Sequence, residues 1–278
     1  MTFPFIRGRL PTPDGLCLSL DGLHSNGCEM SKIVERTLDC FELFADQKKP
    51  LSLTEISRLL GIPPSSCHDV LKALQQRGYL YELTPRGGFY PTLRLYDLAR
   101  TVADNDPVLV RAELLLKSLR DRVDESVTLA KVNGLQATYL LTFESAQQLR
   151  ISVKVGMNLR SVYATAAGKA LLASLDERAL GNYLKSTELK PLTAHTVKSA
   201  AELRRQLETG RERGYFDNRE ESIEGVSTIA APFRWLDSLY IVAVAGPTAR
   251  IEPKLAWAPQ LLMDACKNLE MRSEPAKT

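Results

Sequence analysis

A short stretch in the first third of the chain constrains the fold most, because signals for two helices and a tight turn follow one another there. Ser52 and Glu55 have the spacing of a capping box, which favours the start of a helix. Gly61 stands where a left-handed residue would end that helix. Pro63-Pro64 comes next, and proline is well tolerated at the first position of a helix. We therefore predict two helices joined by a short turn, with the second ending near Arg77-Gly78.

The segments on either side extend this motif. An earlier helix is predicted from Ser31, a suitable N-cap, to the stop signal Lys48-Lys49-Pro50. Its apolar residues recur at helical spacing: Val34, Leu38, Phe41 and Ala45. After the second helix of the pair, strand-like pieces at 79–81 and 89–90 flank a segment rich in turn residues, which predicts a hairpin. Three helices followed by a hairpin describe a winged helix.

The residues of the helix pair suit a helix-turn-helix, whose two helices pack at a steep angle. Apolar or small residues stand where the helices and the turn must meet: Ile56, Ser57, Leu60, Ile62, Cys67 and Val70. Leu53 belongs to the buried face of the first helix of the pair, and Leu71 and Leu74 are assigned to the inward face of the second. We interpret Cys67 as a small core residue rather than a reactive thiol. Many helix pairs satisfy part of this pattern, so a pair that makes protein contacts and has no role with DNA remains an alternative.

In such a motif the second helix lies in the major groove, with its N-terminal part nearest the bases. The candidate DNA-binding residues are the polar positions of this helix, one at the start of the preceding helix and one at the wing tip: Thr54, Ser65, Ser66, His68, Asp69, Lys72 and Arg86. Serine can bond phosphates or bases, and Lys72 can reach a phosphate. A carboxylate such as Asp69 repels phosphate unless it accepts from cytosine N4. An exposed His68 of no consequence and a solvated Arg86 are the plainer alternatives.

The rest of the chain predicts a second, mixed unit. Asp106-Pro107 begins a helix whose buried side is assigned to Val110, Leu114 and Leu119, and Pro253 is predicted to open a C-terminal helix. Capped helices are also predicted from Thr165 to Ala173 and from Ser199 to about Gly214. Strands are predicted at 127–132, 138–143, 151–155, 228–233 and 239–245, the first two around the hairpin turn Asn133-Gly134. Strands and helices without strict alternation favour an α+β fold with an antiparallel sheet.

Short strings in a fixed order give the chain a resemblance to the IclR family of bacterial transcriptional regulators. The resemblance covers residues 31 to about 270. It is carried by LTEISRLLGIP at 53–63, RGYL at 77–80, ATAAGKALLA at 164–173, RGY at 213–215, EESIEGV at 220–226, IAAP at 229–232 and AGP at 245–247. The resemblance implies an N-terminal winged helix and a GAF-like effector domain, acting as homodimers or tetramers on palindromic double-stranded operators.

The resemblance also implies a small organic effector, such as an organic acid, an aromatic acid or a sugar-acid breakdown product. By resemblance, the effector-binding residues are Arg160, Ala166, Ala167, Asn218, Val226, Thr228, Ala243 and Ala245. Ala243 and Ala245 stand where keto-acid binders tend to have serines, and Asn218 stands where they have aspartate. Arg160 likewise replaces a usual apolar residue. These departures leave fewer polar groups deep in the pocket and favour a larger or more apolar effector. Asp69 stands where many members have arginine, so the operator sequence does not carry over.

The small residues after Thr165 have their own physical interpretation. Free N–H groups at the start of a helix, together with its dipole, favour a carboxylate, and Ala166 and Ala167 would let one approach. Small residues serve close packing of a helix on a sheet equally well, so both interpretations stay open.

Other classes of protein fit the sequence less well. Five dispersed cysteines without a CxxC pair argue against a disulfide framework or a zinc site, and we expect no metal and no cofactor. Gly168-Lys169 lacks the spacing of a phosphate loop, and the acidic cluster of Asp217, Glu220, Glu221 and Glu224 is interpreted as a solvated loop. We expect a protein that is not an enzyme, has no membrane span and resides in the cytoplasm. A net charge of +3 neither demands nor excludes nucleic acid.

The expected organisation has five parts. Residues 1–30 form a flexible extension, with packing on a partner subunit as the alternative. Residues 31–91 form the winged helix-turn-helix domain, 92–105 a linker helix, 106–272 the effector and oligomerisation domain, and 273–278 a tail.

Overall fold

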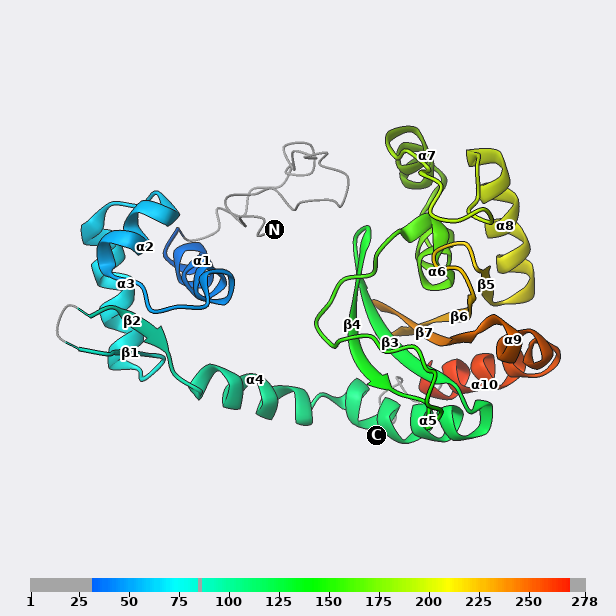
Figure 1. Ribbon diagram of the computed structural model, residues 1–278, viewed down its shortest axis with the longest axis horizontal. Coiled ribbons are helices and arrows are strands. Elements are labelled where there is room, and N and C mark those ends of the chain that lie inside the picture. The colour runs from blue at the N-terminus through cyan, green and yellow to red at the C-terminus, as the bar shows by residue number, and fades with distance from the viewer. Residues whose placement is uncertain (1–31, 85–86, 271–278) are drawn as a thin grey trace, which may run out of the picture. The chain divides into compact units, whose positions relative to one another are not determined.

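The computed structural model describes residues 32–84 and 87–270, and the chain divides into two compact units between Ala103 and Asp104 (Figure 1). The predicted N-terminal extension, the cap Ser31, the wing residue Arg86 and the C-terminal tail lie outside the described residues. The α+β class is confirmed, since a helical first unit with a small hairpin precedes a second unit built on a five-stranded antiparallel sheet.

The first unit contains the predicted three helices and wing. Its elements are α1 (Lys32–Gln47), α2 (Leu53–Leu60), α3 (Pro64–Gln76), β1 (Leu80–Glu82), β2 (Phe89–Pro91) and α4 (Arg94–Asp104). The backbone of Leu51 pairs with that of Phe89, with N···O distances of 3.1 and 2.8 Å, so the segment before α2 adds a bridge to the wing. The core lies where α1, α2, α3 and the wing meet.

The caps predicted around α2 are confirmed. The Ser52 side chain accepts from the Glu55 N–H while the Glu55 carboxylate accepts from the Ser52 N–H, so the capping box is complete. Gly61 is left-handed, with φ at 63°, and its N–H caps carbonyls at the end of the helix. Ser57 donates its hydroxyl to the Ile62 carbonyl at 2.7 Å, which fixes the turn between α2 and α3.

The apolar face predicted for α1 is mostly wrong. Val34 and Leu38 are 51% and 57% exposed, whereas Cys40, Leu43 and Phe44 are buried. The helix carries two apolar stripes, and hydrophobic spacing alone does not tell which of them meets the core.

The second unit is a sheet with helices on both faces (Figure 1). The strands, in the spatial order β4-β3-β7-β6-β5, are β3 (Ser126–Asn133), β4 (Gln136–Phe143), β5 (Phe216–Arg219), β6 (Val226–Trp235) and β7 (Ser238–Pro247). One apolar core joins a sheet face to α5 (Pro107–Val123) and α10 (Ala258–Glu270). The other joins the opposite face to α6 (Ala166–Ala173), α7 (Glu177–Ser186) and α8 (Ala200–Arg213).

Shorter helices complete this unit: η2 (Val162–Ala164), α9 (Thr248–Ile251) and η3 (Glu252–Ala256). The predicted caps Asp106, Thr165 and Ser199 each accept a hydrogen bond from the first turn of their helix. The predicted hairpin joins β3 to β4, but its loop is Gly134 and Leu135, because Asn133 still pairs with Gln136. No helix in the described parts of the chain is long and apolar enough to cross a membrane.

Two element predictions are wrong in this unit. Residues 151–155 form no strand, because the edge of β4 pairs instead with the following residues, from the Gly156 N–H to Tyr139 and from the Leu159 N–H to Ala137. Pro253 lies in η3, and α10 begins only at Ala258, because the φ of -139° at Trp257 is not helical.

The buried face predicted for α5 is also wrong, except at Leu119. Val110 and Leu114 are 52% and 76% exposed. The core instead receives Val108, Ala112, Leu116, Leu119 and Val123. As in α1, a second apolar stripe is left facing away from the core.

One fully buried carboxylate ties distant parts of this unit together. Glu125 accepts two hydrogen bonds from Arg250, at 2.7 and 2.8 Å, and one from Lys254 at 2.8 Å. Arg250 also donates to the Leu149 carbonyl, and Lys254 to that of Val123. A methyl group at Gly246 would overlap the Glu125 carboxylate, so glycine is what lets β7 pass this close to the cluster.

Candidate DNA-binding and effector sites

The residues of α3 separate into an apolar face held in the core and a polar face that is free to meet a ligand. Cys67, Val70, Leu71 and Leu74 are buried, as predicted from their spacing. The candidate DNA-binding residues of α3 lie on the other side: Ser65, His68, Asp69 and Lys72 are exposed, and Ser66 is half-buried. Thr54 is exposed on the first turn of α2.

The exposed face of α3 has charges of both signs. Asp69 has an 83% exposed side chain, and its carboxylate lies 3.6 Å from Nδ1 of His68. Lys72 is one turn further along, with no ion pair to any described residue. A basic side chain and two small hydroxyl residues on this face can contact phosphates and base edges, and a carboxylate among them can accept a hydrogen bond from cytosine N4.

The predicted effector residues of the sheet share one face of the second unit. Asn218, Thr228 and Ala245 lie side by side in register across β5, β6 and β7. Ala243 lies on the same face of β7, and Ala243 and Ala245 pack toward the α6 side of the sheet. Because α6 packs on these three strands, its first residues, Ala166 and Ala167, are buried over this part of the sheet.

The start of α6 combines backbone donors with close packing. The Thr165 hydroxyl accepts from the Gly168 N–H at 3.1 Å, so the N–H groups of Ala166 and Ala167 remain as first-turn donors without an intrahelical acceptor. A side chain at Gly168 would overlap the Val162 backbone. Packing therefore accounts for Gly168, whereas the two alanines fit both packing and the approach of an anion.

Both polar atoms of the Asn218 side chain make hydrogen bonds within the loop after β5. Its Oδ1 accepts from the Glu221 N–H at 2.7 Å, and its Nδ2 donates to the Ser222 hydroxyl at 3.0 Å. Thr228 lies beside it, and its buried hydroxyl has no partner among the described residues. The hydroxyl of Thr228 is thus the better placed of the two to meet a ligand.

The remaining predicted effector residues lie at the edges of this region. Arg160 is exposed in the segment before η2, and Val226 is half-buried at the start of β6. Arg160 makes no hydrogen bond or ion pair with any residue in the two described ranges.

An ion pair that the sequence interpretation missed lies next to Asn218. Lys169 of α6 is buried, donates to the Asp217 carbonyl at 2.9 Å and pairs with the carboxylate of Glu221. Burial lowers the pKa of the Lys169 ammonium and raises that of the Glu221 carboxyl, although each is opposed by the charge of its partner. The pair fastens the loop after β5 to α6.

The acidic cluster is therefore more than the solvated loop that the sequence suggested. Glu221 is buried, and Asp217 bonds Arg213 at 2.7 Å and Arg219 at 3.1 Å. Thr193 and Thr196 donate to the carbonyls of this loop, which adds a second attachment. Within the described residues, no group of acidic, histidine or cysteine side chains could hold a metal ion.

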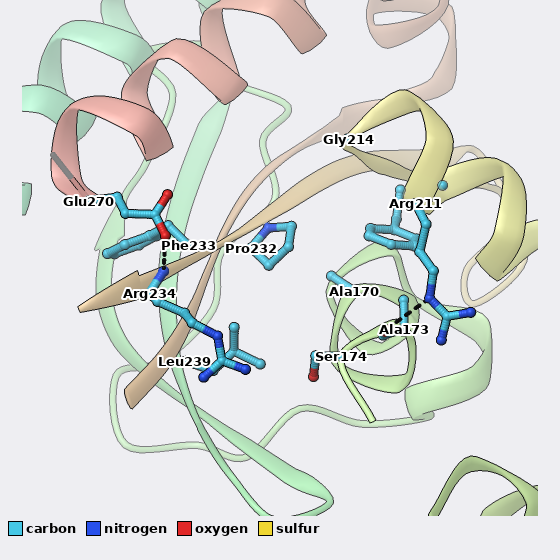
Figure 2. Close-up of a pocket in the computed structure, with 12 residues that line it drawn as sticks. Ala170, Ala173, Ser174, Arg211, Gly214, Pro232, Phe233, Arg234, Leu239 and Glu270 are labelled. Atoms are coloured by element: carbon cyan, nitrogen blue, oxygen red, sulfur yellow. Dashed lines mark hydrogen bonds between the residues drawn. The ribbon is translucent and has the colours of Figure 1, made fainter. Parts of the chain in front are cut away.

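A cavity of about 380 Å³ opens at the other end of α6 (Figure 2). It is lined by residues of α6, α8, β6 and β7, including Ala173, Arg211, Arg234 and Leu239. None of the predicted effector residues lines it.

Comparison with known families decides what the two units are. The IclR helix-turn-helix domain model matches residues 33–83, and the model of the bacterial transcriptional regulator IclR C-terminal domain matches residues 100–270. The chain belongs to the IclR family. Members of the family are transcription regulators and not enzymes, so this IclR-type protein is a DNA-binding regulator with an effector domain, as the resemblance implied.

Individual relatives agree with this assignment. The chain is 30% identical to the HTH-type transcriptional regulator XynR of Escherichia coli over 76% of its own length and 84% of the relative's. It is also 30% identical to the regulator TtgV of Pseudomonas putida, over 86% of this chain and 90% of the relative.

Solved structures share the fold. An IclR transcriptional regulator from Alicyclobacillus acidocaldarius superposes with a TM-score of 0.70 at 23% identity, covering 88% of this chain and all of that one. An IclR homologue from Microbacterium hydrocarbonoxydans, solved in complex with 4-hydroxybenzoate, gives a TM-score of 0.67 at 23% identity, covering 86% and 98%.

Proposed function

We propose that this IclR-type regulator binds a palindromic operator as a homodimer that can assemble into a tetramer, and that a small organic carboxylate modulates its binding. The observation that carries the DNA-binding part is the division of α3, whose apolar face is buried while Ser65, His68 and Lys72 face outward. A protein with this role works in the cytoplasm, where the DNA is. The proposed functional division of the chain is 31–91 for DNA, 92–105 as the linker and 106–272 for effector and oligomerisation.

The proposed DNA contacts are those expected from the sequence. Lys72 and Arg86 bind phosphates, Ser65 and Ser66 bind phosphates or base edges, and Thr54 supports the contact from α2. His68 and Asp69 contribute to base selection. A helix-turn-helix places its recognition helix in this way, with positioning by phosphate contacts and specificity by base contacts.

The proposed effector site lies between the start of α6 and the row of residues on β5, β6 and β7. The N–H groups of Ala166 and Ala167 bind the carboxylate, and the Thr228 hydroxyl, which has no partner in the described part of the chain, donates or accepts one hydrogen bond. Ala243, Ala245 and Val226 provide an apolar wall, and Arg160 lies at the rim. An aromatic carboxylate fits this mostly apolar lining, and the Microbacterium homologue in complex with 4-hydroxybenzoate supports that class.

We propose that effector and operator binding are thermodynamically linked. An effector that prefers one arrangement of the dimer shifts the affinity for the operator, and the operator must then shift the affinity for the effector by the same factor.

The test is fluorescence anisotropy of a duplex from the region upstream of the protein's own gene, with and without a panel of aromatic and aliphatic carboxylates. We expect specific binding over a scrambled duplex, and a change in Kd with one effector class. If the protein binds neither this duplex nor the operators of other IclR-family regulators more tightly than the scrambled duplex, the result would favour the alternative, in which the helix-turn-helix makes protein contacts.

A further inference from the structure

The cavity at the C-terminal end of α6 is separate from the proposed effector site. The effector site uses the first residues of the helix, whereas this hollow is bordered by its last ones, Ala170 and Ala173, and by Ser174. Pro232 and Leu239 supply apolar surface from β6 and β7. A volume of about 380 Å³ falls within the range of small-molecule sites and is large enough for one substituted ring.

The charged residues around this hollow give it an excess of positive charge. Of the twelve residues that line it, Arg211 and Arg234 are cationic and Glu270 is anionic. Figure 2 shows the two arginines on opposite sides of Ala173 and Ser174 in this view. The Glu270 carboxylate accepts from the backbone N–H of Arg234 at 3.4 Å, so it is engaged at the wall of the hollow.

Both guanidinium groups retain free donors. Arg211 donates its Nε to the Ala173 carbonyl at 3.0 Å, which holds the side chain against the end of α6. Its Nη groups, and the whole guanidinium of Arg234, have no hydrogen-bond or ion-pair partner within residues 32–84 and 87–270. Guanidinium groups bind carboxylates through paired N–H···O bonds, and their position beside an apolar surface selects ligands with both features.

We propose that this hollow is a second small-molecule site, which binds an amphipathic monoanion: a carboxylate attached to an aromatic ring or a branched apolar body. The carboxylate is bound by Arg234 and Arg211, and the apolar body lies on Pro232, Leu239 and Ala173. The proposal does not depend on which effector occupies the other end of α6, or on the operator.

The test uses the full chain with ¹³C-labelled alanine methyl groups, which report on both ends of α6. Benzoate is titrated, with benzamide as its neutral counterpart. We expect benzoate to shift the Ala170 and Ala173 signals saturably and benzamide to leave them in place. The first-turn alanines, Ala166 and Ala167, report independently on the effector site.

Matched variants identify the groups that bind. Arg234→Gln and Arg211→Gln are each expected to weaken benzoate binding at Ala173 by about three- to fivefold, which is the range of an exposed charge pair. The control is Arg205→Gln. Arg205 is exposed on α8, the helix that carries Arg211, but does not line the hollow, so benzoate binding should be unchanged. Ala173→Leu should fill the hollow and abolish the shift at Ala170, and circular dichroism checks that each variant is folded.

Three results would overturn the proposal. One is the absence of any saturable shift at Ala170 and Ala173. Another is a shift confined to Ala166 and Ala167, which would assign benzoate to the effector site alone. The third is unchanged binding in both arginine variants and in Ala173→Leu.

Discussion

On the exposed face of α3, we expect the single residues Lys72 and Asp69 to have opposite effects on DNA binding. A lysine bound to phosphate releases a counterion, and this contribution is independent of sequence. A carboxylate can only be tolerated where it accepts a hydrogen bond or keeps away from phosphate. Affinity and base selectivity are thus expected to depend on different residues of one helix.

We predict that Lys72→Gln weakens operator and nonspecific DNA binding alike. The slope of log K against log salt should fall in magnitude by about one, because one phosphate contact is lost. The measurement is anisotropy between about 50 and 200 mM salt. Lys185→Gln, an exposed lysine on α7, is the control. A slope equal to that of the native chain would remove Lys72 from the phosphate contacts, and the same experiment on Arg86→Gln tests the wing.

A second residue-scale prediction concerns Asp217. Burial raises its pKa, but the hydrogen bond and charge of Arg213 and the charges of Arg219 and Lys169 outweigh burial, so the pKa lies below its ordinary value. A carboxyl with a lowered pKa stabilises the fold above its unfolded-state pKa, near 4, and loses that contribution as the pH falls through the folded-state value.

Asp217→Asn should therefore cost about 1 kcal/mol of unfolding free energy at pH 7 and much less near pH 3. Urea unfolding between these two pH values measures the difference. If the free energy of unfolding changed with pH in the same way in the native chain and in the variant, the ion pair of Asp217 with Arg213 would contribute nothing to stability.

Single-residue roles were only partly predictable from the sequence. The inward residues of α3 follow from helical spacing, and they are buried as expected. The pairing of Lys169 with Glu221 joins residues 52 positions apart, and no local pattern specifies it. The engagement of Asn218 likewise depends on a loop conformation that its residue type does not determine.

Among the elements, the helix ends of the first unit are the best determined by local chemistry. The left-handed conformation of Gly61 closes α2, and the Ser57 hydroxyl closes the turn that follows. Such signals lie within a few residues of one another, so the sequence alone was enough to predict them.

We predict that Gly61→Ala destabilises the protein by about 1 kcal/mol, because a side chain is disfavoured at a φ of 63°. Operator affinity should fall as well, since the turn sets the angle of α3. Thermal unfolding and anisotropy measure the two effects. Gly181→Ala in α7, where a side chain would meet nothing within 4 Å, is the control and should be neutral or stabilising. Equal stability of the two variants would contradict the role given to the turn.

Burial was less predictable than helix position. α1 and α5 each carry two apolar stripes. In both helices the stripe that we predicted to be buried is largely exposed, and the other stripe packs into the core. The difference depends on which face the rest of the chain covers, and this is a property of tertiary packing rather than of helical period.

For the whole molecule, the exposed stripes have a direct implication. Ile33, Val34 and Leu38 on α1 are more than half exposed. Large apolar side chains are also exposed on α4, at the residue before it, and on α5: Leu93, Leu95, Tyr96, Leu98, Val102, Val110 and Leu114. Exposed apolar stripes on helices mark association surfaces, so each of these faces by itself supports the proposed homodimer.

We predict that the double variant Val34→Lys/Leu38→Lys shifts the protein toward monomer. Affinity for a palindromic operator should fall by about a hundredfold, since two half-site contacts are no longer linked. Light scattering after size exclusion measures the mass. The control is Leu135→Lys, at the exposed turn after β3, which should leave the mass and the operator affinity unchanged. A variant that remains dimeric would exclude this face of α1 from the interface.

The cluster around Glu125 also limits the order in which this protein can evolve. A methyl group at position 246 would overlap the Glu125 carboxylate, which Arg250 and Lys254 hold in place, so we expect a shorter side chain at 125 to be acquired first. Losing that carboxylate in turn leaves Arg250 and Lys254 without their shared anion, which favours later replacement of both. Among aligned relatives, a residue other than glycine at 246 should therefore occur only with a residue shorter than glutamate at 125, and these four positions should covary as one group.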